Sequence, residues 1–284
     1  MIMEAKDFSR TKALKKVGIS YLGATKQSAK LMYSYNNGVE TYGVYLAPAT
    51  LARDKKHKNL NVCPFSEQCA DSCLAGAGHN KIAILAQKGA IGLTKIDQAR
   101  IKKTHLFYDN RELFMRILVS EIASAKARAE KSGKGFAVRL NCTSDLNPEL
   151  FVLDGKNILE IFPDVQFYDY TKVPTRLSLV DKYKNYYLVF SYDGCNWNVC
   201  EQALSNGVNV AVVFDIENEN GKQVLPDTYK GYDVIDGNNS DIRYIEPRSV
   251  IVGLHYHRVG KDYIGAERKY VPRQTPFIIR ENIF

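Results

Sequence analysis

Three of the six cysteines lie close together in the stretch NVCPFSEQCADSCLAGAGH, at Cys63, Cys69 and Cys73. Cys69 and Cys73 are four residues apart, so a helical turn would place both on one face, with Cys63 approaching from the preceding loop. Three converging thiolates can hold an iron–sulfur cluster with one iron left open, whereas structural zinc takes four ligands. The stretch is polar and contains Pro64, which is not typical of a core segment. The spacing therefore predicts a metal site, either iron–sulfur or zinc.

A fourth ligand could come from several places. His79 follows Gly76 and Gly78, which would allow the chain to turn back tightly. Cys195 and Cys200 belong to a later α/β unit, and either could approach the same face. The alternative is that the cysteines are unrelated and buried, because free Cys is among the most buried residue types.

The elements around this stretch are expected to begin with strands and continue with long helices. Asn36-Asn37-Gly38 separates two Tyr/Val-rich stretches, and Gly after Asn supplies the positive φ of a tight turn, which predicts an N-terminal β-hairpin. Helical spacing is found from Ile82 to Leu106 and from Arg111 to Lys131. The cysteines would thus lie between a strand and two helices.

The second half of the chain alternates between strands and helices. Helices are expected through Ile158 to Phe162, in PTRLSLVDKY and in VCEQALSNG, and the strands are FAVRLN, VQFYDYT, YYLVFSYD, VNVAVVFD and, as the last, VIVGLHYH. Alternation of apolar strands with helices predicts an α/β fold with a parallel sheet. We expect a complete or partial (β/α) barrel with the hairpin as an extension, and an open doubly wound sheet is the alternative.

The division expected from these elements has three parts within one domain. Residues 1–60 form the hairpin extension packed on the core, residues 61–132 the cysteine loop and two long helices, and residues 133–284 the alternating β/α core.

Polar side chains follow nearly every predicted strand. The carboxyl ends of parallel strands meet on one face, where ligands bind, so one pocket could collect these groups. Asp, Ser and Thr at such positions also cap helices, which is the competing explanation for Asp145 and Asp193. Lys172 and Arg139 are expected to have anionic partners. The groups are Asn141, Thr143, Ser144 and Asp145 after the first strand, Asp169, Tyr170, Thr171 and Lys172 after the second, Ser191, Tyr192 and Asp193 after the third, and Asp215 after the fourth.

Composition limits the function classes. With 284 residues, 45% of them hydrophobic, the chain is long enough for one large domain or two modest ones, and no apolar run reaches the roughly 20 residues that cross a bilayer. We therefore expect a protein of the bacterial cytoplasm with reduced cysteines and no membrane partner. The net charge of +8 favours anionic substrates or nucleic acid. The motifs GxGxxG, GxxxxGK[ST] and GxSxG are absent, which removes support for nucleotide-loop and serine-hydrolase functions.

Seven segments in a fixed order resemble an uncharacterised family of phages and mobile elements called gene product 88. They are LNVCPFSEQCADSCLAGAGH, RIKKTHLFYDN, AVRLNCTSDL, FYDYTKVPTR, YLVFSYDGCNW, GVNVAVVF and VIDGNNSDIR, and the resemblance covers about Gly18 to Gly253. It implies a phage, prophage or plasmid setting and carries no established activity.

The order of strand, three-cysteine loop, helix and β/α units is also similar to the radical S-adenosylmethionine enzymes. That resemblance implies a [4Fe–4S] cluster on Cys63, Cys69 and Cys73, with S-adenosylmethionine at the open iron. The usual spacing there is C-x3-C-x2-C, whereas this chain has x5 and x3. Binding of that cofactor would fall to Asn141, Thr143, Ser144 and Ser191.

Two functions follow as expectations. The first is an iron–sulfur enzyme that acts on a nucleotide, nucleic acid or other anionic substrate by radical-type chemistry, with Asp145, Asp169 and Lys172 as acid–base groups and Tyr170 as a relay. The second is a zinc-stabilised nucleic-acid-binding or replication accessory protein without catalysis. A sharper form of the second uses His255 and His257 as metal ligands, with Tyr168 or Tyr170 as nucleophile. A catalytically silent regulator of host machinery is a third alternative.

Overall fold

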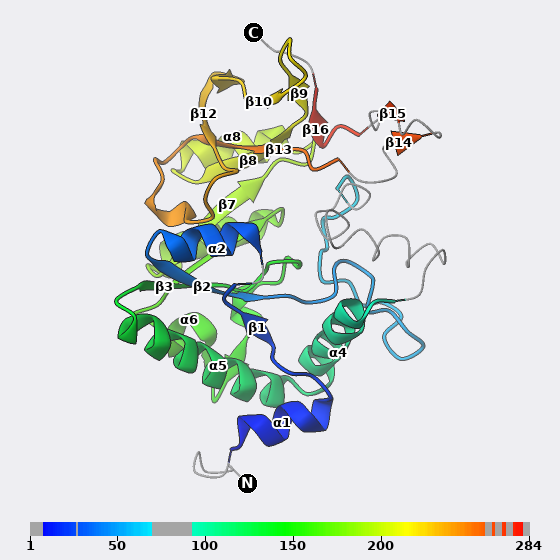
Figure 1. The fold of residues 1–284 in the computed structure, drawn as a ribbon, viewed down its shortest axis with the longest axis vertical. Coiled ribbons are helices and arrows are strands. Elements are labelled where there is room, and N and C mark those ends of the chain that lie inside the picture. Colours follow the sequence, from blue (N-terminus) through cyan, green and yellow to red (C-terminus); the bar gives the residue numbers. More distant parts are fainter. Residues whose placement is uncertain are drawn as a thin grey trace. The chain divides into compact units, whose positions relative to one another are not determined.

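The computed structural model describes residues 8–26, 28–69, 93–258, 263–264, 269–270 and 275–280. These residues form seven α-helices and a central sheet of ten strands (Figure 1). The strands of the sheet are β1 (Gly23–Ala24), β2 (Val39–Val44), β3 (Gly135–Arg139), β6 (Gln166–Thr171), β7 (Tyr186–Ser191), β8 (Asn209–Phe214), β11 (Thr228–Tyr229), β12 (Tyr232–Asp236), β13 (Ile251–His255) and β16 (Ile278–Ile279).

The sheet is mostly parallel. Its strand order is β1-β2-β3-β6-β7-β8-β13-β12-β11, and β16 pairs with β8. Parallel pairing joins β2 to β3, β3 to β6, β7 to β8, β8 to β13 and β13 to β12, whereas β1 and β11 are antiparallel to their neighbours. The predicted α/β class with parallel strands is therefore confirmed, and closure into a barrel is not shown by the pairings of the described residues.

The chain groups into two compact units. Unit 1 comprises Met1–Val62, Lys95–Tyr168 and Tyr183–Tyr186, and unit 2 comprises Cys63–Thr94, Asp169–Lys182 and Tyr187–Phe284. Each unit is thus made of three segments that are not contiguous in the sequence.

Unit 1 is built around one long helix. Its helices are α1 (Arg10–Val17), α2 (Ala29–Asn36), α4 (Lys95–Asp109), α5 (Arg111–Lys131) and α6 (Ile158–Ile161). The Asn110 side chain caps α5 by accepting from the Leu113 backbone N–H at 3.0 Å. One face of α5 carries fully buried residues such as Phe114, Leu118 and Ile122, and the helix packs on β2 and β3. The helix predicted from Arg111 to Lys131 is confirmed. Of the one predicted from Ile82 to Leu106, residues 82–92 lie outside the described part, and α4 begins at Lys95.

The predicted N-terminal hairpin is wrong. Its first arm is α2, which begins after Ser28, whose hydroxyl accepts from the Leu31 backbone N–H at 3.2 Å. Gly38 does adopt a positive φ of 88°, but this conformation ends a helix instead of joining two strands. β2 then finds its antiparallel neighbour in β1, and its parallel neighbour in β3 with Val39 opposite Gly135.

Unit 2 matches the predicted alternation. The 3₁₀ helix η6 (Pro174–Ser178) continues as α7 (Leu179–Lys182), β7 leads into α8 (Trp197–Ser205), and β8 follows. Phe190, Cys200, Leu204, Val210 and Phe214 share one buried core cluster. The prediction that VIVGLHYH, which forms β13, is the last strand is wrong. Ile278 and Ile279 of β16 pair in parallel with Val213 and Phe214 of β8.

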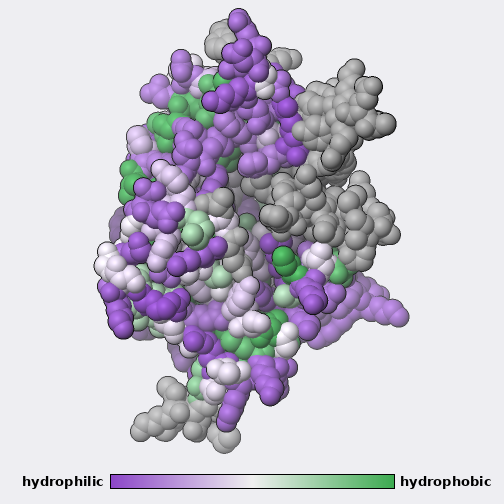
Figure 2. All heavy atoms as spheres, viewed as in Figure 1, coloured by the Kyte–Doolittle hydropathy of each residue, from purple (hydrophilic) through white to green (hydrophobic). Residues whose placement is uncertain are grey.

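The remaining elements are short. The antiparallel pairs are β4 (Val152–Leu153) with β5 (Lys156–Asn157), β9 (Ile216–Glu217) with β10 (Gln223–Val224), and β14 (Tyr263–Ile264) with β15 (Lys269–Tyr270), and the other 3₁₀ helices are η5 (Pro148–Leu150) and η7 (Arg243–Ile245). Among the described residues, no helix combines the length and the apolar character needed to cross a membrane. The described surface in Figure 2 is mainly hydrophilic, with small separate hydrophobic areas.

Candidate functional site

The described part of the cysteine stretch is a turn-rich loop at the start of unit 2. Cys63 and Cys69 are half-buried, and the Cys69 backbone N–H donates to the Ser66 carbonyl at 3.1 Å. Cys73 and His79 lie outside the described residues. The Gln68 carbonyl accepts a hydrogen bond from the Thr275 hydroxyl at 3.1 Å. This bond attaches the loop to the segment Thr275–Arg280, which carries β16.

The segment Thr275–Arg280 packs against the ends of two strands of unit 2. A Cβ atom on Gly194, just after β7, would lie 2.3 Å from the Pro276 carbonyl carbon, so only glycine fits there, and its φ is 100°. The Lys172 ammonium, after β6, lies 5.2 Å from the centroid of the Phe277 ring, within the range of a cation–π contact. The cysteine loop, Lys172 and the end of β7 are therefore joined through one segment.

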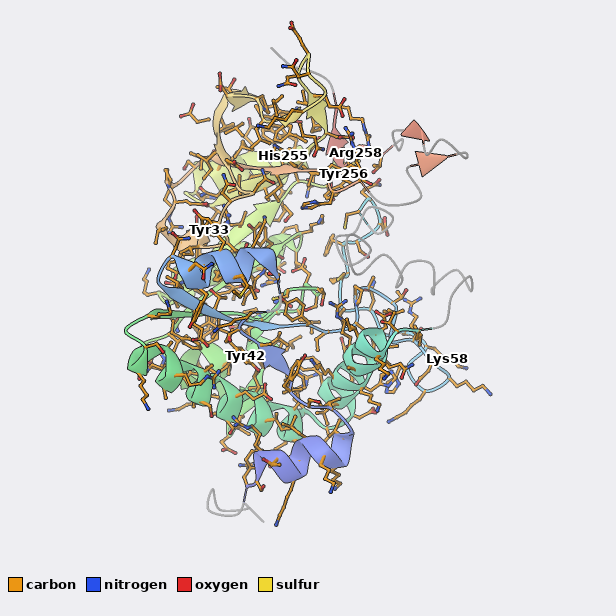
Figure 3. All side chains as sticks on the ribbon, viewed as in Figure 1. Tyr33, Tyr42, Lys58, His255, Tyr256 and Arg258 are labelled. Atoms are coloured by element: carbon orange, nitrogen blue, oxygen red, sulfur yellow. The ribbon has the colours of Figure 1, made fainter. Side chains whose placement is uncertain are left out.

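The end of β8 holds a buried carboxylate among arginines, which we call the arginine cluster (Asp215, Gln223, Arg258 and Arg280). The Asp215 side chain is 1% exposed and accepts from Arg258 at 2.9 and 3.1 Å, Arg280 at 3.3 Å and Gln223 at 3.0 Å. Arg258 follows His255 and Tyr256 just beyond β13 (Figure 3). Burial lowers the pKa of Arg258, but its hydrogen bonds to Glu217 and Asp215 raise that pKa by more. This network ties the carboxyl end of β8 to Arg258, just beyond β13, and to Arg280, just after β16.

Asp169 has a buried partner that the sequence did not suggest. Its carboxylate lies 3.1 Å from an Arg176 nitrogen, and both side chains are 1% exposed. Nearby, Tyr170 is half-buried and interacts electrostatically with the buried Arg243. The ion pair gives Asp169 a structural role, and the predicted catalytic roles of Asp169 and Tyr170 stay predictions.

The end of β7 leads into a turn closed by a side chain. The Asp193 carboxylate accepts from the backbone N–H groups of Cys195 and Asn196 at 2.8 and 3.0 Å. Both groups precede α8, whose N-cap residue is Asn196, so Asp193 closes the turn before the helix and does not cap the helix itself. Ser191 is half-buried, and its carbonyl accepts from the Asn196 side chain at 3.1 Å. Burial, reinforced by Asp193, raises the pKa of the Cys200 thiol to about 12, so this thiol is protonated at neutral pH.

The residues after β3 belong to unit 1 and close a loop. The Asn141 side-chain oxygen accepts from the Ser144 hydroxyl at 2.7 Å and from the Leu146 backbone N–H at 2.9 Å. The Thr143 hydroxyl donates to the Leu46 carbonyl at 2.6 Å, and Asp145 is half-buried. Asn147, and not Asp145, caps η5. The cofactor-binding roles of Asn141, Thr143 and Ser144 stay predictions, as does the catalytic role of Asp145.

The histidines expected to bind a metal on one strand differ in environment. His255 is half-buried at the end of β13, and its backbone N–H donates to the Asn238 side chain at 2.9 Å, whereas His257 is exposed. Tyr168, one of the two candidate nucleophiles, is 1% exposed within β6. These positions give the sharper replication hypothesis no support.

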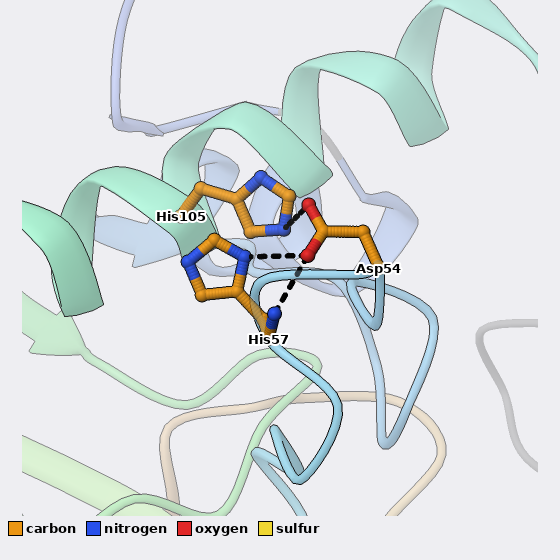
Figure 4. A group of neighbouring side chains, drawn as sticks. All are labelled: Asp54, His57 and His105. Carbon is orange, nitrogen blue, oxygen red and sulfur yellow. Dashed lines mark hydrogen bonds and ion pairs between the residues drawn. The ribbon is translucent and has the colours of Figure 1, made fainter.

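Unit 1 contains a group that the sequence reasoning missed, which we call the histidine cluster (Asp54, His57, His105 and Asp109). His57 Nδ1 lies 2.9 Å from Asp54 Oδ1, and His105 Nε2 lies 3.7 Å from Asp54 Oδ2 (Figure 4). The two imidazole rings stack with centroids 4.2 Å apart. The sequence signals are two short spacings, Asp54 and His57 at i,i+3 on the loop and His105 and Asp109 at i,i+4 on a helix face.

A second carboxylate, that of Asp109, contacts the other ring nitrogen of His57. His57 Nε2 lies 2.9 Å from Asp109 Oδ1, and the Lys56 ammonium lies 2.7 Å from the same oxygen. These contacts with Lys56 and His57 lower the pKa of Asp109 to about 2. The Asp109 hydrogen bond is in turn the main cause of a raised pKa at His57. Asp109 is therefore an anion at neutral pH that orients the His57 ring.

Comparison with known proteins gives one family. Residues 11–269 match the family model described as Gene product 88. The matched range includes the cysteine stretch, the histidine cluster and all of the arginine cluster except Arg280. No curated protein and no solved structure matches the chain.

Proposed function

We propose that this chain, which belongs to the gene product 88 family, is a metalloprotein enzyme that binds an anionic substrate at the carboxyl edge of its unit 2 strands, beside an iron–sulfur site. The observation that carries the proposal is the bond from Thr275 to Gln68, together with the packing of Pro276 on Gly194. These contacts join the cysteine loop to the strand edge, where α/β proteins bind ligands. The stretch β2-β3-β6-β7-β8, in which neighbouring strands of the sheet follow one another along the chain, further favours a partial barrel.

The donor set fits a thiolate-bound metal. Cys63 and Cys69 supply soft sulfur ligands from a half-buried loop, and such ligands select iron–sulfur clusters or zinc. Cys73 would be the third ligand, and His79, Cys195 and Cys200 are the candidates for a fourth. Of these, Cys200 fits least, because it is fully buried in the core cluster of unit 2. When bound, a cluster with an open iron supplies one-electron chemistry that side chains lack.

The chain's own residues orient the substrate. Lys172 is half-buried, and its side chain lies against the Phe277 ring. This contact restricts the side chain, so its ammonium group is held in place to pair with an anionic group of the substrate. Ser191 offers a hydroxyl at the end of the next strand, and Tyr170 offers a phenol that can relay a proton. Asp169 neutralises Arg176 and so acts through it as a positioning residue.

The test is anaerobic purification followed by iron, sulfide and zinc analysis and an absorption spectrum. Iron and sulfide in near-equal amounts, lost in Cys69→Ala and retained in the matched control Cys142→Ala, at a free cysteine of unit 1, would support the cluster. Assays for S-adenosylmethionine cleavage would follow. A wild-type protein without iron, sulfide or zinc after anaerobic purification and reconstitution would rule the cysteine site out.

Zinc-stabilised binding of nucleic acid is the second candidate, because Lys55, Lys56 and Lys58 are all exposed on one loop. Zinc at one per chain in the same analysis would favour it. Binding to DNA would then weaken with salt, and Lys55→Ala with Lys58→Ala would lower the slope of log affinity against log salt by about 2, since each phosphate contact contributes about 0.9. An unchanged slope would contradict this candidate.

A further inference from the structure

We propose a second metal site, separate from the cysteine stretch, in which Asp54, His57 and His105 bind one divalent transition-metal ion, with zinc as the best match to the donors. The proposal rests on the histidine cluster of unit 1 and is independent of the proposed function. Imidazole nitrogen and carboxylate oxygen together are the donor set of zinc sites with three protein ligands.

The spacing of the donor atoms fits a single ion. One ligand atom from each of the three side chains lies within 4.8 Å of the other two. Ligand atoms about 2.0 Å from a tetrahedral ion are about 3.3 Å from one another. The observed separations are close to that value, at 2.9 Å from His57 Nδ1 to Asp54 Oδ1 and 3.7 Å from His105 Nε2 to Asp54 Oδ2 (Figure 4). Binding through a single oxygen of Asp54 therefore requires the carboxylate and the His105 ring to turn toward the ion.

An outer carboxylate already holds the ligand ring. Histidines that bind metals commonly donate their other ring N–H to a carboxylate, which fixes the tautomer and makes the coordinating nitrogen more basic. Asp109 takes this role toward His57 Nε2 at 2.9 Å, and Lys56 holds Asp109. His57 Nδ1 then faces Asp54. This arrangement is what distinguishes the cluster from a chance group of surface charges.

Proton transfers accompany binding. Without the ion, His57 Nδ1–H can donate to Asp54, and His105 Nε2–H donates to the Ala52 carbonyl at 2.7 Å. Binding releases the Nδ1 proton of His57 to solvent, and the His105 proton moves from Nε2 to Nδ1, because a coordinating nitrogen must present its lone pair. Charge and protons thus balance with one proton released per ion when His57 starts as the imidazolium.

The site is open on one side. Asp54 is 45% exposed, and Lys55, Lys56 and Lys58 lie along the same loop. Three protein ligands with a solvent-facing position form the pattern of catalytic zinc sites, since structural sites use four protein ligands. The open position would take water or an anionic ligand, with the lysines favouring the anion.

The experiment removes the cysteine site first. A tag-free Cys63→Ser/Cys69→Ser/Cys73→Ser chain is titrated with Co²⁺ by absorption and with Zn²⁺ by calorimetry. We expect one ion per chain and a cobalt spectrum without thiolate charge-transfer bands. Asp109→Asn should weaken binding about 10- to 100-fold, as outer-ligand changes do, and Asp54→Asn or His105→Gln by more than about 100-fold. His257→Gln, at an exposed histidine outside the cluster, should leave the affinity unchanged.

Two results would overturn the site. One is the absence of binding by the folded triple variant, and the other is an affinity that is insensitive to His105→Gln. If the triple variant does not fold, zinc is added to the wild-type chain and the ring-nitrogen NMR signals are followed. Shifts at His57 and His105, assigned with His57→Gln, support the site, and the absence of shifts at these two rings contradicts it. Because the cysteine site is tested by iron and sulfide content, the two proposals fail separately.

Discussion

The histidine cluster of unit 1 and the arginine cluster of unit 2 both surround a carboxylate with nitrogen donors, yet they differ in chemistry. Asp215 is almost fully buried, and its arginine partners stay protonated and have no lone pair to offer. Asp54 is nearly half exposed, and its imidazole partners can lose a proton and bind an ion. Burial and the identity of the cation, more than the number of charges, decide whether a cluster fixes the fold or binds a ligand.

The largest loss of stability is expected when an ion pair with two buried partners is broken. Asp169→Asn leaves Arg176 as a buried charge without its carboxylate, which typically costs about 3–5 kcal/mol of unfolding free energy. Urea denaturation measures the loss. Asp164→Asn is the matched control, because Asp164 pairs with Lys126 but is 63% exposed, so its denaturation midpoint should not change. Equal midpoints for the two variants would contradict the conclusion that burial makes the Asp169–Arg176 pair important for stability.

A smaller loss is expected in the arginine cluster itself. Asp215→Asn keeps the shape and one acceptor oxygen but removes the charge, and hydrogen bonds to charged groups contribute about 1.5–3 kcal/mol. Arg258 retains Glu217, which limits the loss to about 2 kcal/mol. The same denaturation experiment tests this value. A variant as stable as wild type would mean that the arginines do not depend on Asp215.

Zinc should stabilise unit 1 and not the arginine cluster. At a free zinc concentration about 100 times its Kd, the unfolding free energy should rise by about 2.7 kcal/mol in the Cys63→Ser/Cys69→Ser/Cys73→Ser chain. Adding Asp54→Asn should abolish the rise, whereas adding Asp215→Asn should preserve it. Thermal melts with and without zinc give the measurement, and a rise that survives Asp54→Asn would place the ion elsewhere.

The smallest effect concerns reactivity alone. Cys195 is exposed, whereas Cys200 is buried and its pKa is raised to about 12, so at pH 8 its reactive thiolate is scarce. Iodoacetamide should label Cys195 in the native protein and Cys200 only after unfolding, as read by peptide mass spectrometry. Because the raised pKa leaves only a small fraction of the thiol ionised even at pH 9, Cys200 labelling should stay far below Cys195 labelling from pH 7 to pH 9. Equal labelling of both cysteines would contradict the assigned burial.

The sequence predicted elements better than contacts. The spacing of apolar residues located α5, and the β/α alternation located β6, β7, β8 and α8, because these patterns depend on local period. It failed at Gly38, where the same positive φ serves a helix end as well as a hairpin turn. In each of these cases the information lies within a few neighbouring residues.

The candidate sites depend on longer distances in the chain. Asp54 meets His105 from another element, and Asp215 meets Arg280, and no local pattern reports either meeting. Asp169 was recognised as a polar residue at a strand end, but its partner Arg176 was not, since nothing in PTRLS distinguishes a buried arginine from an exposed one. The cysteine spacing was visible in the sequence, and its role stays a prediction.

The pairing of β16 with β8 has a consequence for the order of events during synthesis. Ile278 and Ile279 leave the ribosome long after Val213 and Phe214, which they flank. Until then, the carboxyl end of β8 keeps an unpaired edge, and such edges invite association with other chains. The growing chain would therefore keep this short stretch of β8 open to other chains until β16 arrives, even after β13 has paired with the other side of β8.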